Sequence, residues 1–383
     1  MKKPLSSLKN SLCLLITVVA FAGCGGSGPG SGPTPTPTPT PTPSPVPTPT
    51  PAPADRYEAI LLHPSGYLYS TASGVAGDVQ VGSAMLASST RQAVLWRSTT
   101  SSVNLHPSGF SASAGTRALG ELQVGYGHST TQGGSHALLW RGSAASVTDL
   151  HSSAFFSTQA QGLSATAQVG NGTFNTIAGT HALLWYGTPE SVVDLHPSGY
   201  YDSYARDVDG EYQVGVGYTV GTFKPHALLW RGTAASAVDL NPAGFALSEA
   251  LAVSGEYQGG YGVLSTGTPN LVHALLWRGT AASVVDLSPA GFSESEVTDL
   301  AGDRQVGFGL SNEGGASHAL VWRGTPQSVV DLHSLLTGLT VDGRRLNVGS
   351  STALGVDSAG NVVGEVFEGG MAAGYAVLWR RLP

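Results

Sequence analysis

Apolar and polar residues alternate along this chain in a repeated pattern, and residues 204–244 show one copy of it. Asp209-Gly210 is a tight-turn signal between two strand-like runs, because glycine readily adopts a positive φ. A variable loop, residues 217–225, precedes the next run. Four antiparallel strands in about 45 residues are the unit of a propeller blade. The predicted strands span residues 205–208, 212–216, 226–230 and 236–240.

The third strand of this unit is apolar on both of its faces. His226, Leu228 and Trp230 share one face, while Ala227 and Leu229 share the other. Such a strand should be covered on both sides, as it is when sheets stack face to face. The fourth strand alternates Val and Asp, which predicts an outer, half-exposed strand.

All seven tryptophans close a copy of this third strand, which marks a repeat protein. The last spacing is longer than the others, and residues 335–347 should form an elaborated loop or a small helix there. The tryptophans lie at positions 96, 140, 185, 230, 277, 322 and 379.

The fourth strand is out of phase with the other three. Its first copy, residues 59–62, precedes every other strand, and the last unit ends at residues 379–383 without one. A closed ring explains this, because the N-terminal strand then completes the C-terminal blade and removes an open edge. Residues 55–383 are therefore predicted to be an all-β, seven-bladed propeller of four-stranded antiparallel blades.

Composition removes several classes of function. Charged residues make up 11 % of the chain, the formal net charge is −7, and there is no basic stripe, which disfavours nucleic-acid binding. The only cysteines, Cys13 and Cys24, lie near the N-terminus. The rest of the chain therefore has no disulfide framework and no cysteine-based metal site. No metal site and no cofactor is predicted.

The first 23 residues have the pattern of a secretory signal peptide. Three lysines precede an apolar stretch, residues 12–21, that is too short to span a bilayer. Phe21-Ala22-Gly23-Cys24 resembles a bacterial lipobox, which implies a lipid on Cys24 and, without an acidic residue at position 25, an outer-membrane or cell-surface location. The alternative is cleavage after Ala20-Phe21-Ala22, which would release a soluble secreted protein.

Residues 24–54 follow as a linker rich in proline and threonine. Proline fixes φ and removes hydrogen-bond donors, which favours an extended polyproline II chain. The segment is predicted to be either a stiff spacer that lifts the propeller off the membrane or a plain disordered linker.

Ten of the eleven histidines occupy repeat positions. Five open the third strand, as His136 does, and five follow the fourth strand, as His151 does. A catalytic site needs one convergent set, whereas copies on every blade suit hydrogen bonds within or between blades. The repeated aspartates, such as Asp149, are expected to bond turns or repeat arginines such as Arg141 and Arg231.

The repeated motifs His-Ala-Leu-Leu-Trp and Val-Asp-Leu, together with Gln-Val-Gly in the second strand, resemble the HAF family of bacterial extracellular repeats. That family carries His-Ala-Phe where this chain has His-Ala-Leu. The resemblance extends over residues 56–381. It implies an exported, propeller-like repeat protein and no catalytic residues.

The loops between the second and third strands differ most between copies, so they are predicted to form the working face. Aromatic residues in or beside these loops suit stacking on sugars or peptides, and His128 is the one histidine outside the repeat. The loops span residues 127–135, 172–180, 217–225, 262–272 and 309–317. The candidate ligand-binding residues are His128, Phe174, Tyr218, Phe223 and Tyr261.

Three functions are compatible with these features. The first is a surface-tethered, non-enzymatic propeller that binds an extracellular glycan or protein. The second is a propeller-type lyase or glycosidase, which requires isolated acidic residues to converge although no spacing pairs them. The third is a purely structural envelope protein. The isolated acidic residues are Asp202, Glu249, Glu294, Glu296 and Glu313.

Overall fold

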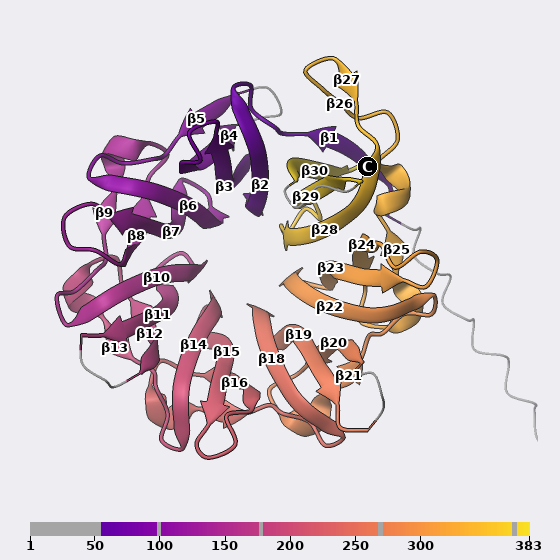
Figure 1. Cartoon of the computed structure of the whole chain (residues 1–383). Coiled ribbons are helices and arrows are strands. Elements are labelled where there is room, and N and C mark those ends of the chain that lie inside the picture. Colours follow the sequence, from indigo (N-terminus) through magenta and orange to yellow (C-terminus); the bar gives the residue numbers. More distant parts are fainter. Residues whose placement is uncertain (1–54, 98–100, 176–178, 267–270, 370–373) are drawn as a thin grey trace, which may run out of the picture. The chain divides into compact units, whose positions relative to one another are not determined.

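The computed structural model describes residues 55–97, 101–175, 179–266, 271–369 and 374–383. They form seven four-stranded antiparallel sheets arranged around a central channel, which confirms the predicted seven-bladed propeller (Figure 1). The predicted signal peptide, Cys24 and the linker lie outside the described residues. None of the helices in the described ranges is long and apolar enough to cross a membrane.

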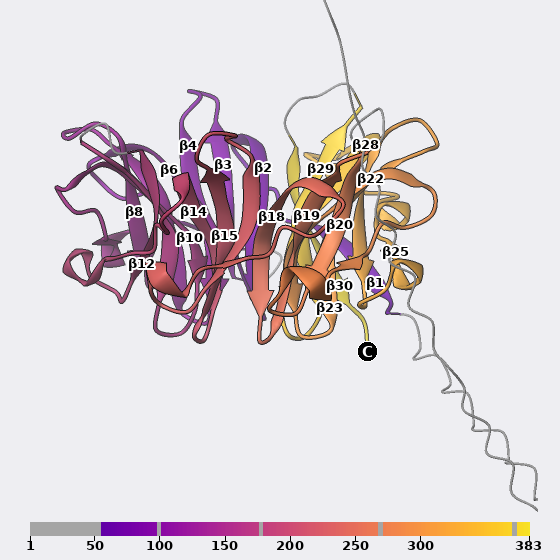
Figure 2. The ribbon, with the colours of Figure 1, turned by 90° about the horizontal axis from the view of Figure 1, so that it is seen from below.

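Each blade runs from an inner strand at the channel to a short outer strand, and Figure 2 shows these strands passing between the two faces of the propeller. Blade 1 comprises β2 (Tyr67–Ala76), β3 (Val79–Leu86), β4 (Arg91–Arg97) and β5 (Ser102–Asn104). Blade 2 comprises β6 (Phe110–Leu119), β7 (Leu122–Ser129), β8 (Ser135–Trp140) and β9 (Thr148–Asp149). Blade 3 comprises β10 (Phe155–Leu163), β11 (Gln168–Phe174), β12 (Thr180–Trp185) and β13 (Val193–Asp194).

The remaining blades repeat this order, except that the last takes its outer strand from the start of the propeller. Blade 4 comprises β14 (Tyr200–Asp209), β15 (Tyr212–Thr219), β16 (Pro225–Trp230) and β17 (Val238–Asp239). Blade 5 comprises β18 (Phe245–Ser254), β19 (Tyr257–Leu264), β20 (Val272–Trp277) and β21 (Val285–Asp286). Blade 6 comprises β22 (Phe292–Ala301), β23 (Arg304–Ser311), β24 (Ser317–Trp322) and β25 (Val330–Asp331). Blade 7 comprises β28 (Val348–Val356), β29 (Val362–Glu368), β30 (Tyr375–Arg381) and β1 (Tyr57–Leu61).

The third strand of each blade is covered on both faces, as its pattern predicts. In blade 4, Trp230 and Leu228 pack against Leu184 and Val169 of blade 3, while Leu229 packs on the opposite side, toward blade 5. Trp230 is fully buried. Alternate side chains of this strand therefore pack against its two neighbouring blades.

The fourth strand is shorter than expected. The prediction of a strand over residues 236–240 is wrong, because residues 234–236 form the 3-10 helix η3 (Ala234–Ser236) and only β17 pairs with β16. Ser236 explains the turn, since its hydroxyl donates to the carbonyl of Thr233 at 2.6 Å and accepts from the amide of Arg231 at 2.8 Å. These local hydrogen bonds replace the strand ladder. Equivalent 3-10 helices are η1 (Ala144–Ser146), η2 (Pro189–Ser191), η4 (Ala281–Ser283) and η5 (Pro326–Ser328).

Buried hydroxyl groups join every blade to its neighbour. In each case the amide of the third-strand alanine donates to a serine or threonine of the next inner strand, as Ala227 does to Ser248 at 3.1 Å. Such a bond satisfies a backbone donor that would otherwise be buried without a partner. The hydroxyls belong to Ser70, Ser113, Thr158, Ser203, Ser248, Ser295 and Ser351.

The two ends of the described chain meet in blade 7, which confirms the predicted closure. β1 pairs antiparallel with β30, and Ile60 lies opposite Leu378. Asp55, whose side chain is 3 % exposed, is held by three arginines: Arg304 Nε at 3.1 Å, Arg323 Nη2 at 2.7 Å and Arg381 Nε at 2.6 Å. Burial acts to raise the pKa of Asp55, but these hydrogen bonds outweigh it and hold the pKa well below its usual range. The carboxylate thereby joins blade 6 to blade 7.

The extra length before the last blade forms two small elements, in agreement with the prediction of an elaborated loop or small helix. A 3-10 helix, η6 (His333–Leu335), is followed by a hairpin of β26 (Thr340–Val341) and β27 (Arg344–Arg345). Leu336, Val341 and Leu346 of this segment are buried against blades 6 and 7.

Candidate functional site

The inner strands bring one residue from each blade to the same level of the channel. These positions are equivalent in the repeat but differ in chemistry, so the channel wall is polar on one side and partly apolar on the other. The seven residues are Ser73, Thr116, Gln161, Arg206, Leu251, Thr298 and Leu354.

Arg117 lies across the channel and links three blades. Its Nη1 lies 3.1 Å from Asp299 Oδ2 of blade 6, and its Nε lies 4.0 Å from Asp207 Oδ1 of blade 4. Burial raises the pKa of both carboxyls against the opposing pull of Arg117, since one guanidinium faces two acids. The backbone amides of Val253 and Val356 donate to Asp207 and Asp299, respectively. The two carboxyls are therefore held in place by backbone hydrogen bonds as well as by Arg117.

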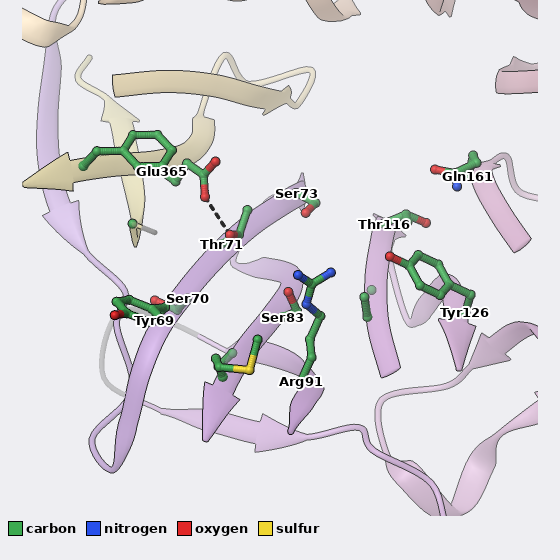
Figure 3. A pocket seen from close by; sticks show the side chains of 16 residues that line it. Tyr69, Ser70, Thr71, Ser73, Ser83, Arg91, Thr116, Tyr126, Gln161 and Glu365 are labelled. Carbon is green, nitrogen blue, oxygen red and sulfur yellow. Dashed lines mark hydrogen bonds between the residues drawn. The ribbon is translucent and has the colours of Figure 1, made fainter. Parts of the chain in front are cut away.

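A cavity of about 420 Å³ opens beside the channel, between blades 7, 1 and 2. It falls in the range of about 300 to 1,000 Å³ that is typical of small-ligand pockets. Ser73, Thr116 and Gln161 line both this cavity and the channel, so the two are continuous. We call this cavity the mouth pocket. Its other polar lining residues are Tyr69, Ser70, Thr71, Ser83, Arg91, Tyr126 and Glu365 (Figure 3).

Glu365 projects from β29 into the mouth pocket and is held by Thr71 of blade 1. The Thr71 hydroxyl donates to Glu365 Oε2 at 2.7 Å (Figure 3). Burial raises the pKa of Glu365, although the Thr71 hydrogen bond and the charge of Arg91 act to lower it. The carboxyl is therefore fixed in position and is more easily protonated than an exposed glutamate.

Several polar groups of the mouth pocket have no partner among the described residues. Arg91 carries no salt bridge or hydrogen bond to any of them, and the hydroxyls of Ser83 and Tyr126 are likewise unbonded there. In Figure 3, the Arg91 guanidinium and the Tyr126 hydroxyl point into the same space from neighbouring blades. These groups are available to a polar ligand, and the Tyr126 ring adds a surface on which a sugar can stack.

Two of the isolated acids predicted from the sequence converge on the opposite side of the channel. Glu249 of β18 is 8 % exposed, and its Oε2 lies 3.5 Å from Arg206 Nη2. Burial and the charge of Glu249 raise the pKa of Glu296 on the neighbouring β22 to about 7. Burial also raises the pKa of Tyr261 strongly, together with the charge of Glu249 and a hydrogen bond to it. The charge of Glu249 on blade 5 thus acts on Glu296 on blade 6, although the two residues lie far apart in the sequence.

The repeated histidines form hydrogen bonds, as predicted, and the repeated aspartates bond a turn, as expected, and also a histidine. His136 Nδ1 lies 2.7 Å from Asp149 Oδ2, and His136 stacks on His151 with ring centroids 3.8 Å apart. Asp149 also accepts from the His151 amide at 2.9 Å, so the expected bond to a turn is present. Of the two expected partners, only the turn is found, since no hydrogen bond or ion pair joins these aspartates to Arg141 or Arg231 within the described residues. The Arg231 guanidinium lies over the Tyr212 ring instead. The same pairing recurs at His181, His226, His273 and His318.

The five candidate ligand-binding residues do not form one site. Burial raises the pKa of Tyr218 and Tyr261, and the charge of the nearby Glu249 carboxyl raises both further. Phe174 packs between Phe155 and His181, with ring centroids 4.6 and 4.9 Å away. Phe223 is 58 % exposed in a loop at φ +53° and contacts Tyr201. His128 is exposed on β7. Only the two tyrosines therefore lie beside other candidate groups.

Sequence reasoning missed the mouth pocket because its residues lie on strands rather than in the variable loops. One signal was present in the repeat itself. The residue after the conserved glycine of the second strand changes from blade to blade, and three of these residues line the mouth pocket. The set is Ser83, Tyr126, Asn171, Val216, Tyr261, Phe308 and Glu365.

No group of three or more His, Cys, Asp or Glu side chains with metal-binding geometry occurs in the part of the chain that the structure describes. A scan against known protein families finds no match, and a search of curated proteins finds none either. The predicted relation to the HAF repeats and the predicted lipoprotein signal therefore stay predictions.

Solved structures similar to this chain are propellers. A Pyrococcus horikoshii acylaminoacyl peptidase has a TM-score of 0.51 at 11 % identity, covering 82 % of this chain and 52 % of the peptidase. A puromycin hydrolase has a TM-score of 0.47 at 11 % identity, covering 78 % and 50 %. The BP39L lectin from Burkholderia pseudomallei has a TM-score of 0.40 at 12 % identity, covering 84 % of this chain and 97 % of the lectin. This chain spans about half the length of the two hydrolases.

These comparisons correct the expectation that the protein is not an enzyme. The similar structures include the acylaminoacyl peptidase, an enzyme that shares this fold at a TM-score of 0.51. At identities near 11 % the likeness shows the fold alone, and that fold carries both catalysis and binding. The function of this chain therefore depends on the residues of its own channel and mouth pocket.

Proposed function

We propose that this protein binds a saccharide in the mouth pocket. The observation that carries the proposal is the lining of that cavity, which combines hydroxyls, one carboxyl, one guanidinium and tyrosine rings from three blades. A sugar presents many hydroxyl groups and apolar ring faces, so it needs convergent donors and acceptors beside an aromatic surface. The Ser83 and Tyr126 hydroxyls and the Arg91 guanidinium supply donors, and Glu365 supplies an acceptor.

The proposal includes an extracellular setting. The signal-like residues 1–23, the lipobox cysteine Cys24 and the Pro/Thr-rich residues 24–54 support export and a lipid tether to the membrane. A tethered propeller on a spacer would meet polysaccharides at the cell surface. This location supports a glycan as the ligand over an intracellular metabolite.

Binding is tested with Tyr126→Ala. We expect the variant to bind its saccharide at least about tenfold more weakly, because loss of a stacking ring costs on the order of 1.4 kcal/mol. A glycan array would identify a ligand for the full chain, and titration calorimetry would measure both affinities. Tyr186→Ala is the matched control, since Tyr186 is 53 % exposed and lies outside the pocket. Equal affinities of wild type and Tyr126→Ala would place the ligand elsewhere.

Hydrolysis of a glycosidic bond is a second candidate function, and the Glu249–Glu296 pair favours it. Glycosidases use one protonated and one ionised carboxyl. Glu296, with its pKa raised to about 7, is suited to donate a proton to the leaving oxygen. Glu249, beside Arg206 and Tyr261, is suited to activate a water that attacks the anomeric carbon. Each glycosidic bond that is cleaved consumes one water molecule.

The hydrolysis candidate predicts a large effect of Glu296→Gln. We expect its kcat to fall by about 100-fold or more, because the amide cannot donate the proton. The wild-type rate should fall as pH rises above about 7, where Glu296 loses its proton. The measurement is reducing-end release from oligosaccharides, with Glu294→Gln on the same strand as control. A saccharide that binds but is never cleaved by the wild type would remove this candidate and leave binding intact.

A further inference from the structure

We propose that the saccharide of the mouth pocket is acidic, and that Arg91 binds its carboxylate. This inference rests on the proposed saccharide binding and deepens it by naming the ligand as a uronate-containing glycan. It is carried by the position of one guanidinium in the pocket and by the donors around it.

Arg91 is placed in the pocket by the hairpin of blade 1. It is the first residue of β4 and lies opposite Met85 in the register with β3. Two residues before Met85 in β3, Ser83 lies opposite Thr71 of β2, so Thr71, Ser83 and Arg91 share one face of the blade. Figure 3 shows the guanidinium extending along this face toward the channel, with the Ser83 hydroxyl beside it.

The absence of an internal partner distinguishes Arg91 from other arginines near the channel. Arg117 is bound to two aspartates and Arg206 to Glu249. Arg91 has no such contact within the described residues, so its fork of N–H donors is free to take a ligand. A planar carboxylate matches that fork in two parallel hydrogen bonds, which are stronger than bonds between neutral groups.

The other groups of the pocket tolerate an anion. Thr71 donates to Glu365 Oε2 and leaves Oε1 as an acceptor. Burial raises the pKa of this carboxyl and so favours its neutral form. Ser83 and Tyr126 are neutral donors. The formal net charge of −7 matters less than these neighbours, because salt screens charges beyond about 8 Å at physiological ionic strength.

The test compares matched glycans on the full chain. Oligogalacturonate and oligoglucuronate, their carboxyl-reduced neutral forms and sulfated oligosaccharides of equal length are titrated by calorimetry. We expect wild type to bind the uronates at least about tenfold more tightly than the reduced forms. Arg91→Gln should lose this preference, because its affinity for the uronates falls much further than its affinity for the reduced forms, and Arg91→Lys should keep part of the preference. Arg141→Gln, an exposed arginine outside the pocket, should behave as wild type.

The outcomes separate this inference from the proposed function. Equal affinity for uronates and reduced glycans, or an unchanged preference in Arg91→Gln, would overturn the inference and leave saccharide binding standing. Tighter binding of sulfated glycans than of uronates would reject the carboxylate as the recognised group. Binding of none of the glycans would reject both proposals. Thermal melting of each variant shows whether it is folded.

Discussion

Trp230→Ala should destabilise the propeller by about 3–5 kcal/mol, the usual cost of removing a large buried aromatic side chain. Trp230 is fully buried and packs with Leu184 and Val169 of blade 3. Its indole N–H has no acceptor among the described residues, so the loss comes from packing and the cavity left behind. Urea unfolding of wild type and variant measures the difference.

Tyr186→Ala is the control for this substitution. Tyr186 directly follows the equivalent tryptophan of blade 3 but is 53 % exposed. Its removal should change stability by no more than about 0.5 kcal/mol. If Trp230→Ala were equally mild, the tryptophans could not be the main contacts between blades.

Removal of β1 should have the second large effect. A chain that begins at His63 loses five residue pairs with β30, the buried side chains of Tyr57 and Leu62, and the Asp55 carboxylate between three arginines. Each buried apolar side chain contributes about 1.5–3 kcal/mol, and breaking a buried ion pair costs about 3–5 kcal/mol. We expect a total loss above about 5 kcal/mol and a melting temperature lower by at least about 10 °C.

A chain that begins at Asp55 is the matched control for this truncation, because it keeps β1 and the Asp55 contacts. It should have the same melting temperature as the full chain. The shorter chain should also aggregate, since the edge of β30 is left unpaired. An identical melting temperature for the two truncated chains would mean that β1 does not hold the ring closed.

The repeat made the blades predictable, because the same physical demand recurs seven times. A third strand that is apolar on both faces requires a sheet on either side, and tryptophan at its end fills the gap between blades. The fourth strand was predicted too long, since Val238-Asp239 alternates like a strand while Ser236 closes a local turn. The alternation of apolar residues does not show whether a side chain such as that of Ser236 will bond the local backbone in place of the neighbouring strand.

The candidate sites were less predictable, because they use positions at which the repeat varies. Glu365 and Arg91 lie in different blades and 274 positions apart, and the closure of the ring brings both to one pocket. Glu249 and Glu296 were recognised as isolated acids, but their pairing depends on equivalent positions in adjacent inner strands. A motif with fixed spacing in the sequence cannot reveal side chains that come close only because two blades pack together.

The sequence by itself determined the class, number and closure of the blades. Period-two alternation fixes which faces are buried, seven tryptophans count the sheets, and a displaced fourth strand requires the chain ends to meet. The tertiary structure decided which polar side chains share a cavity. The reason is that strand register and ring geometry set the distances between blades, so Arg91, Tyr126 and Glu365 acquire a common role only once seven sheets surround one channel.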